Sequence, residues 1–179
     1  NPIHNGHVTL AEYFSKLPEL DEVLVVISPQ SPLKKEEGLV NDYERLEMAE
    51  IVFKKFNNVR VSDIEFKMSK PNFTIDTLKE FKKRHKYNKL ILLIGEDNLV
   101  GFNKWKDYKK IIEIAEVYVY PRDTNQKIPD EILSNNNIKL VDAPKIKISS
   151  SHIRELIKSN KKIDALVPKE VLGFFKFIT

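Results

Sequence analysis

The chain has 179 residues, of which 41% are hydrophobic and 31% are charged. This length and composition are typical of one soluble domain with its own core, and they exclude a largely disordered protein. No apolar run approaches the roughly 20 residues of a membrane-spanning helix, so we expect no membrane association. Cysteine is absent, which excludes a disulfide framework and fits a reducing, cytoplasmic location.

The charge balance is mildly basic, because 30 Lys and Arg side chains face 26 Asp and Glu side chains, giving a net charge of +4. A basic surface can attract nucleic acid or a polyphosphate substrate. The lysines are spread along the predicted helices without a dense block. We therefore interpret most of them as a solvated surface and expect no nucleic-acid partner.

Strand-like and helix-like stretches alternate from the beginning of the chain, which predicts a parallel sheet with helical crossovers. Residues 7–17 predict a helix, and the apolar run 23–27 favours a central strand that is buried on both faces. Pro and Gly mark residues 28–41 as a loop. A helix over residues 42–56 and a short strand at 59–61 follow.

The second half continues the same alternation. Residues 74–86 predict a helix with Thr74 as its N-cap, and residues 89–94 predict a second buried strand, directly before Gly95. The remaining expected elements are, in order, a helical stretch through Trp105, a helix at 108–114, a strand at 117–120, a polar loop at 123–137, a strand at 138–141, a short helix preceded by Ser149–Ser151 and a closing helix at 171–177. We expect a single domain over residues 1–179.

The tetrapeptide His4-Asn5-Gly6-His7 stands at a predicted helix start, where free N–H groups and the positive helix end attract an anion. Gly6 would let a phosphate approach the backbone, and two histidines three residues apart can both donate to it. Two surface histidines near a frayed end are an equally good interpretation of these four residues alone. A metal site is weaker, because no Asp, Glu or third His lies at ligand spacing. We expect a β-strand and a Gly-rich turn before this segment.

A second cluster, Ile148 to Arg154, places hydroxyl groups before a predicted helix. Such hydroxyls are N-caps and also phosphate donors, and Arg154 lies one turn further along, within reach of the same anion. Without the first motif, simple helix capping and a surface arginine would be the better interpretation. Lys34, in the Pro-flanked loop, either reaches a phosphate or is solvated.

A third group follows the strand predicted at 89–94, at the sheet edge where open α/β sheets bind ligands. Gly95 permits close approach, and Asp97 could accept a hydrogen bond from a ribose hydroxyl. Trp105 is more commonly a core aromatic in such a place, but it could stack on a cationic ring. Thr74 begins its predicted helix, where its N–H and hydroxyl would suit a carboxylate or simply cap the helix.

Taken together, these segments resemble the nucleotidyltransferase superfamily with a His-x-Gly-His signature, and within it bacterial nicotinate-nucleotide adenylyltransferase. Leu33 departs from the family pattern, where His is common, and Phe73 and Ser151 stand for the usual Tyr and Thr. The Gly-rich run that precedes the family's first motif is missing before Asn1. The resemblance runs in order through nearly the whole chain, over Asn1–His7, Ser31–Lys35, Tyr43–Met48, Phe73–Leu78, Ile94–Lys106 and Ile148–Arg154.

The resemblance implies a Rossmann-like open parallel sheet with helices on both faces, its first strand missing from this chain. It implies transfer of an adenylyl group from ATP to nicotinate mononucleotide, with Mg²⁺ accompanying ATP and a homo-oligomer allowed. His4 and His7 would be catalytic contacts of the ATP phosphates. The other implied contacts are Gly6, Lys34, Ser150, Ser151 and Arg154 for ATP, and Thr74, Gly95, Asp97 and Trp105 for the nicotinate nucleotide, with Trp105 stacking on the pyridinium.

Two alternatives remain open at this point. Another His-x-Gly-His adenylyltransferase, with phosphopantetheine or nicotinamide mononucleotide as acceptor, would share the first and last motifs. A phosphopantetheine enzyme would not be expected to carry the Thr74 and Trp105 patterns. A non-catalytic nucleotide-sensing module is the rival from another class, and fold similarity alone does not exclude it.

Overall fold

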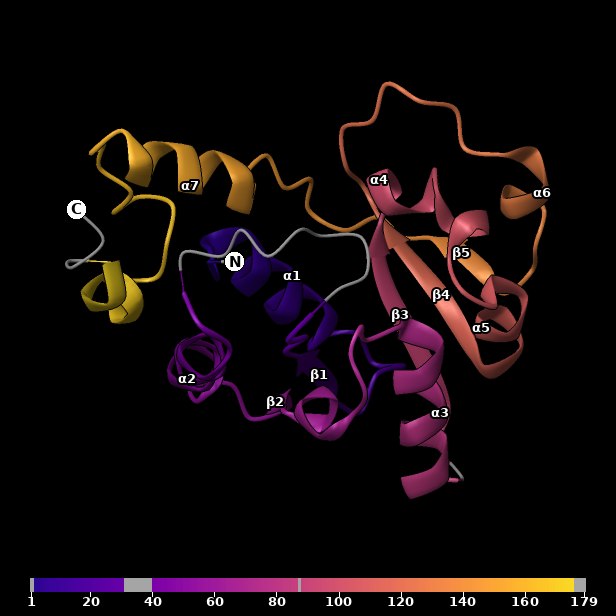
Figure 1. The fold of residues 1–179 in the computed structure, drawn as a ribbon. Helices are drawn as coiled ribbons and strands as arrows, with labels where there is room; N and C mark the ends of the chain where they lie inside the picture. Colours follow the sequence, from indigo (N-terminus) through magenta and orange to yellow (C-terminus); the bar gives the residue numbers. More distant parts are fainter. Residues whose placement is uncertain (1, 31–39, 87, 176–179) are drawn as a thin grey trace. The chain divides into compact units, whose positions relative to one another are not determined.

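The computed structural model describes residues 2–30, 40–86 and 88–175. The chain divides into two compact units: unit 1 comprises Asn1–Pro71 and Ile148–Thr179, and unit 2 comprises Asn72–Lys147. Each unit contains a parallel sheet whose strands are joined through helices, which confirms the predicted α/β class (Figure 1). No helix in the described ranges has the length and apolar character that crossing a membrane requires.

Unit 1 is built around a pair of parallel strands. In β1 (Val23–Val26) Val23 lies opposite Val59 of β2 (Val59–Ser62). The crossover helix α2 (Asp42–Phe53) begins with a capping box, in which Asn41 and Glu44 each accept from the other's backbone N–H, at 3.0 and 3.1 Å. The other elements are α1 (Asn5–Phe14), the 3-10 helix η1 (Ile64–Lys67), α7 (Ser150–Lys158) and the 3-10 helix η3 (Lys169–Phe175).

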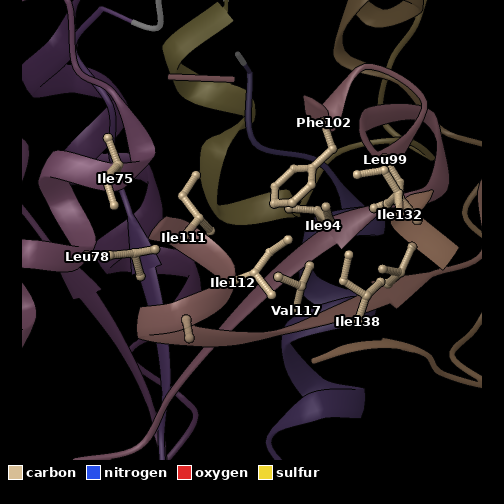
Figure 2. Close-up of a cluster of buried hydrophobic side chains, with 12 residues drawn as sticks. Ile75, Leu78, Ile94, Leu99, Phe102, Ile111, Ile112, Val117, Ile132 and Ile138 are labelled. Carbon is tan, nitrogen blue, oxygen red and sulfur yellow. The ribbon is translucent and has the colours of Figure 1, made fainter. Parts of the chain in front are cut away.

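Unit 2 has a three-stranded parallel sheet in the order β3 (Leu90–Gly95), β4 (Ala115–Tyr120), β5 (Ile138–Leu140). The helical elements are α3 (Thr74–Arg84), α4 (Glu96–Leu99), the 3-10 helix η2 (Phe102–Lys104), α5 (Tyr108–Ile114) and α6 (Asp130–Leu133). Figure 2 shows its apolar core, where Phe102 and Leu99 pack with Ile111 and Val117, all of them fully buried. This core supports the start of α3, the end of β3 and the segment that carries Trp105, where the sequence analysis placed candidate ligand contacts.

Several elements differ from the sequence predictions. Phe73, not Thr74, is the N-cap of α3, so Thr74 is the first helical residue. The predicted loop at 123–137 contains α6, and the predicted closing α-helix is the 3-10 helix η3. In β1, Leu24 is 40% exposed, whereas both faces were predicted to be buried. A strand with one hydrogen-bonded neighbour in the described part of the chain has less apolar cover than a central strand.

The strand with the most complete burial is β4, where Val117 and Val119 are at most 1% exposed. In contrast, the predicted buried strand β3 is only half-buried over its first four residues. The reason is topological, because β4 has a partner on each side and β3 pairs with β4. A continuous apolar run in the sequence does not reveal which strand will be central.

The lysines are also less evenly spread than predicted. Lys82, Lys83 and Arg84 occupy the last turn of α3, and Lys86 and Lys89 follow closely. Cations are stabilised at the negative end of a helix dipole. This basic cluster therefore has a local structural explanation at the end of α3.

Candidate functional site

The two histidines of the first motif form a stacked pair at the start of α1. His4 is the N-cap residue, with extended dihedral angles (φ −145°, ψ 167°), and His7 lies three residues further along. Their ring centroids are 3.7 Å apart, with 27° between the ring planes. His4 is only 5% exposed, whereas His7 is exposed. The pair therefore presents His7 to solvent above a buried His4.

A hydrogen bond orients the exposed ring. The backbone N–H of His4 donates to Nδ1 of His7 at 3.2 Å. Because Nδ1 is the acceptor, the proton of the neutral His7 imidazole lies on Nε2. An Nε2–H group is the kind of donor that an oxygen of a phosphate accepts from, so this tautomer suits an anion at the helix start.

The segment that carries the histidines is anchored by residues far along the chain. The backbone N–H of Asn5 donates to the Leu166 carbonyl at 2.9 Å, and its side-chain amide donates to the Ala165 carbonyl at 3.0 Å. Gly6 follows directly and is buried. These two bonds fix the position of Asn5 at the helix start.

The serine cluster lies at the start of α7, as predicted. Ser149 is the N-cap, and its hydroxyl accepts from the His152 N–H at 3.2 Å. Ser150 Oγ donates to the Pro2 carbonyl at 3.1 Å, and Arg154 Nη2 donates to Ser151 Oγ at 3.0 Å. The bond from Ser150 places the start of α7 beside the residues that lead into the histidine pair. Unit 1 thus brings two of the predicted phosphate clusters together, while Lys34 lies outside the described residues.

In unit 2, Gly95 is the last residue of β3. Together with Asp97, Tyr120 and Arg122 it forms a closely packed corner at the carboxyl end of the sheet. A Cβ built on Gly95 would lie 2.4 Å from Asp97 Oδ1, 2.7 Å from Arg122 Cγ and 3.1 Å from Tyr120 Cε2. Distances this short leave no room for a side chain. Glycine is therefore required here to let Asp97 and Arg122 approach the end of the strand.

Arg122 connects the parts of this corner. Its backbone N–H donates to Glu96 Oε2 at 3.0 Å, and its Nη1 donates to the Ile146 carbonyl at 2.9 Å. Its Nε lies 3.7 Å from Asp97 Oδ2. Burial raises the pKa of the neighbouring Tyr120 hydroxyl above its ordinary value, and the negative charge of Asp97 raises it further. The Asp97 carboxylate is thus held at the carboxyl end of the sheet, beside a guanidinium group.

Thr74 and Trp105 belong to two neighbouring segments of unit 2. The Trp105 ring packs on the buried Phe102 ring, with centroids 5.2 Å apart, and Trp105 itself is half-buried. The next residue, Lys106, pairs with Asp76 in the first turn of α3 at 2.7 Å. Trp105 is therefore partly a core aromatic and partly accessible, and its stacking on a ligand stays a prediction.

Sequence reasoning missed Arg122 and the pairing of Lys106 with Asp76. Arg122 could have been found, because it follows Pro121 after β4, at the same sheet edge as Gly95. The pair of Lys106 and Asp76 spans 30 residues of sequence and depends on how α3 packs, so no local sequence pattern predicts it.

Comparison with known proteins gives consistent matches. Residues 1–156 match the cytidylyltransferase-like family. A curated protein of Flavobacterium psychrophilum, named probable nicotinate-nucleotide adenylyltransferase, is 38% identical over 171 residues, which cover 96% of this chain and 89% of the relative. A protein of the same name from Christiangramia forsetii is 39% identical, over 96% of this chain and 88% of the relative.

Solved structures show the same fold. Nicotinic acid mononucleotide adenylyltransferase of Plasmodium falciparum, complexed with NaAD, superposes with a TM-score of 0.79. The match covers 98% of this chain and 93% of the other, at 22% sequence identity. At this level of identity the likeness establishes the α/β architecture, whereas the relatives above establish the family.

Proposed function

The chain belongs to the cytidylyltransferase-like family and, within it, to the nicotinate-nucleotide adenylyltransferases, and we propose that it transfers the adenylyl group of ATP to nicotinate mononucleotide. The products are deamido-NAD and pyrophosphate, so the reaction is a step of NAD biosynthesis. The observation that carries this proposal in the structure is the hydrogen bond from Ser150 to Pro2. It joins two phosphate-type motifs that are separated by most of the sequence.

The chemistry requires little from acid–base catalysis. A phosphate oxygen of nicotinate mononucleotide attacks the α-phosphorus of ATP and forms the new P–O bond. The bond from this phosphorus to the oxygen bridging to the β-phosphorus breaks, and pyrophosphate leaves with the electron pair. The attacking phosphate is already anionic at neutral pH, so no general base is needed. In-line alignment and stabilisation of the phosphate charges supply the catalysis.

Residues of unit 1 are suited to the ATP phosphates. His7 Nε2–H is exposed at the start of α1 and can donate to a phosphate oxygen as negative charge develops. The stacked His4 fixes the plane of the His7 ring and contributes the backbone bond that sets its tautomer. Arg154 and the Ser151 hydroxyl add donors from α7, Ser150 holds the start of α7 at the Pro2 carbonyl beside the phosphates, and Gly6 keeps the helix start open. We propose a further contact from Lys34.

Residues of unit 2 are suited to the acceptor nucleotide. The Asp97 carboxylate can accept from ribose hydroxyls, and Gly95 allows the nucleotide to approach the backbone. The half-buried Trp105 can stack on the pyridinium ring, whose positive charge strengthens contact with an aromatic face. The first N–H groups of α3, beginning at Thr74, suit the carboxylate of a nicotinate.

ATP enters this reaction with a divalent cation, which we propose is Mg²⁺. Among the residues that the structure describes, no three or more His, Asp and Glu side chains gather where they could hold a metal ion. Mg²⁺ readily binds through phosphate oxygens and water. We therefore treat the cation as part of the Mg-ATP substrate and assign it no protein ligands.

A comparison of acceptors tests the proposed function. The purified protein is incubated with Mg-ATP and either nicotinate mononucleotide, nicotinamide mononucleotide or phosphopantetheine, and released pyrophosphate is measured. We expect the highest kcat/KM with nicotinate mononucleotide. Higher turnover of phosphopantetheine or the amide nucleotide would assign a different acceptor. ATP binding without pyrophosphate release from any acceptor would favour a nucleotide-sensing module.

A further inference from the structure

Lys106 makes two contacts that converge on the beginning of α3. Its Nζ lies 2.7 Å from Asp76 Oδ2 and 4.5 Å from the centre of the Phe73 ring. Phe73 is the N-cap of α3, and Asp76 lies in its first turn. One ammonium group thus holds both an ion pair and a cation–π contact to the same helix start.

Lys106 directly follows Trp105, in a segment whose backbone is held by hydrogen bonds. The Trp105 N–H donates to the Phe102 carbonyl at 3.0 Å, and the Trp105 carbonyl accepts from Tyr108 N–H at 3.2 Å. Between them Asp107 adopts a left-handed conformation (φ 52°), which only a minority of non-glycine residues do. The chain therefore turns sharply directly after Lys106, and its contacts with α3 tie this turn to the helix.

We propose that Lys106 is a positioning residue of the acceptor-nucleotide site: by contacting Asp76 and Phe73 it ties the segment that carries Trp105 to the start of α3 and so fixes the position of the Trp105 ring. The proposal rests on the proposed function, in which Trp105 and Thr74 both contact nicotinate mononucleotide. Because Asp76 balances the charge of Lys106, the residue acts by fixing geometry and not by attracting the carboxylate of the substrate.

The expected effect is moderate, because both partners are partly exposed, at 45% for Lys106 and 36% for Asp76. An exposed ion pair together with an exposed cation–π contact changes an equilibrium by about 3- to 10-fold. Removing the ammonium should therefore raise the KM for nicotinate mononucleotide about 3- to 10-fold. The KM for ATP and the melting temperature should change little.

The test uses Lys106→Met, which keeps much of the side-chain length and removes the charge, and Lys106→Arg, which keeps both contacts possible. Lys110→Met is the matched control, because Lys110 pairs with Asp107 in the same unit at 3.4 Å and is similarly exposed. Steady-state kinetics give KM and kcat for each substrate. Trp105 is the only tryptophan, so acrylamide quenching of its fluorescence reports how well this ring is held.

We expect Lys106→Met to raise the KM for nicotinate mononucleotide and to increase quenching, with Lys106→Arg and Lys110→Met close to the unsubstituted protein. Equal effects of Lys106→Met and Lys110→Met would overturn the proposal. So would a lower melting temperature with unchanged KM and quenching, which would indicate a purely structural role. If the unsubstituted protein does not turn over nicotinate mononucleotide, the proposed function fails. Unchanged quenching in Lys106→Met would then separately refute the positioning of Trp105.

Discussion

Gly95→Ala should damage the acceptor site while leaving the protein folded. The backbone of Gly95 has φ −83° and ψ 156°, a conformation that alanine adopts readily. The added methyl group would, however, meet Asp97 Oδ1 at 2.4 Å and Arg122 Cγ at 2.7 Å. Both atoms must move by about 1 Å to reach an ordinary carbon contact of roughly 3.5–4 Å. The substitution therefore displaces the carboxylate that we assign to the ribose and the arginine beside it.

The magnitude follows from these contacts. Losing a hydrogen bond to a charged group costs about 1.5–3 kcal/mol, which corresponds to a loss of roughly 10- to 100-fold in kcat/KM. Overpacking costs about 1–3 kcal/mol of folding free energy. Replacing glycine at a compatible φ returns about 0.4–1 kcal/mol by restricting the unfolded chain. We therefore expect a net destabilisation of about 0–2.6 kcal/mol.

The assay measures kcat/KM for nicotinate mononucleotide and the denaturant midpoint of the same preparations. Gly101→Ala is the control, since a Cβ built there meets nothing within 4 Å. We expect the control to keep its activity and Gly95→Ala to lose it while remaining folded at the assay temperature. Full activity in Gly95→Ala would refute the assigned role of this corner. An equal loss in Gly101→Ala would show that the method cannot resolve the two positions.

Two further predictions concern the histidine pair and the sheet. His7→Ala should lower kcat about 100-fold, as removal of one transition-state donor does. His85 is exposed, so His85→Ala is the control and should keep its activity. If His7→Ala loses stability and turnover to the same extent, His7 has a structural role. Glu116 bonds Lys89 and Lys139, which lower its pKa, so its contribution to stability is present above the unfolded pKa and is lost as the pH falls through the folded pKa. Glu116→Gln should therefore be about 1 kcal/mol less stable than the unsubstituted protein at neutral pH. Denaturant titrations should show this difference in stability disappearing below pH 4.5, the ordinary pKa of a glutamate side chain. A difference in stability that does not change with pH would contradict the prediction.

The alternation of strands and helices was predictable because it follows from local periodicity. The helix expected at 108–114 is observed as Tyr108–Ile114, since its apolar spacing continues from one end to the other. Residues 117–120 likewise fall within β4. The start of α3 was predicted to within one residue, and the difference concerns only whether Phe73 or Thr74 provides the cap.

Features that depend on packing could not be predicted in this way. The central position of β4 depends on the order of strands in the sheet, which an apolar run does not encode. The roles of Arg122 and Lys106 depend on contacts across 24 and 30 residues of sequence. Their local surroundings are ordinary, because each looks like a surface cation when its neighbours alone are considered.

The serines at the start of α7 show why the motifs were more informative together than singly. Ser149 does cap the helix, so the simpler interpretation of this cluster is correct for that residue. The hydroxyl of the next residue, Ser150, instead donates to Pro2, 148 positions away. Capping uses only one of the hydroxyl groups, so it leaves the following side chains available for a different task. The same turn therefore begins the helix with a cap and places Ser150 next to the segment that carries His4 and His7, so capping and phosphate binding are compatible roles of one sequence.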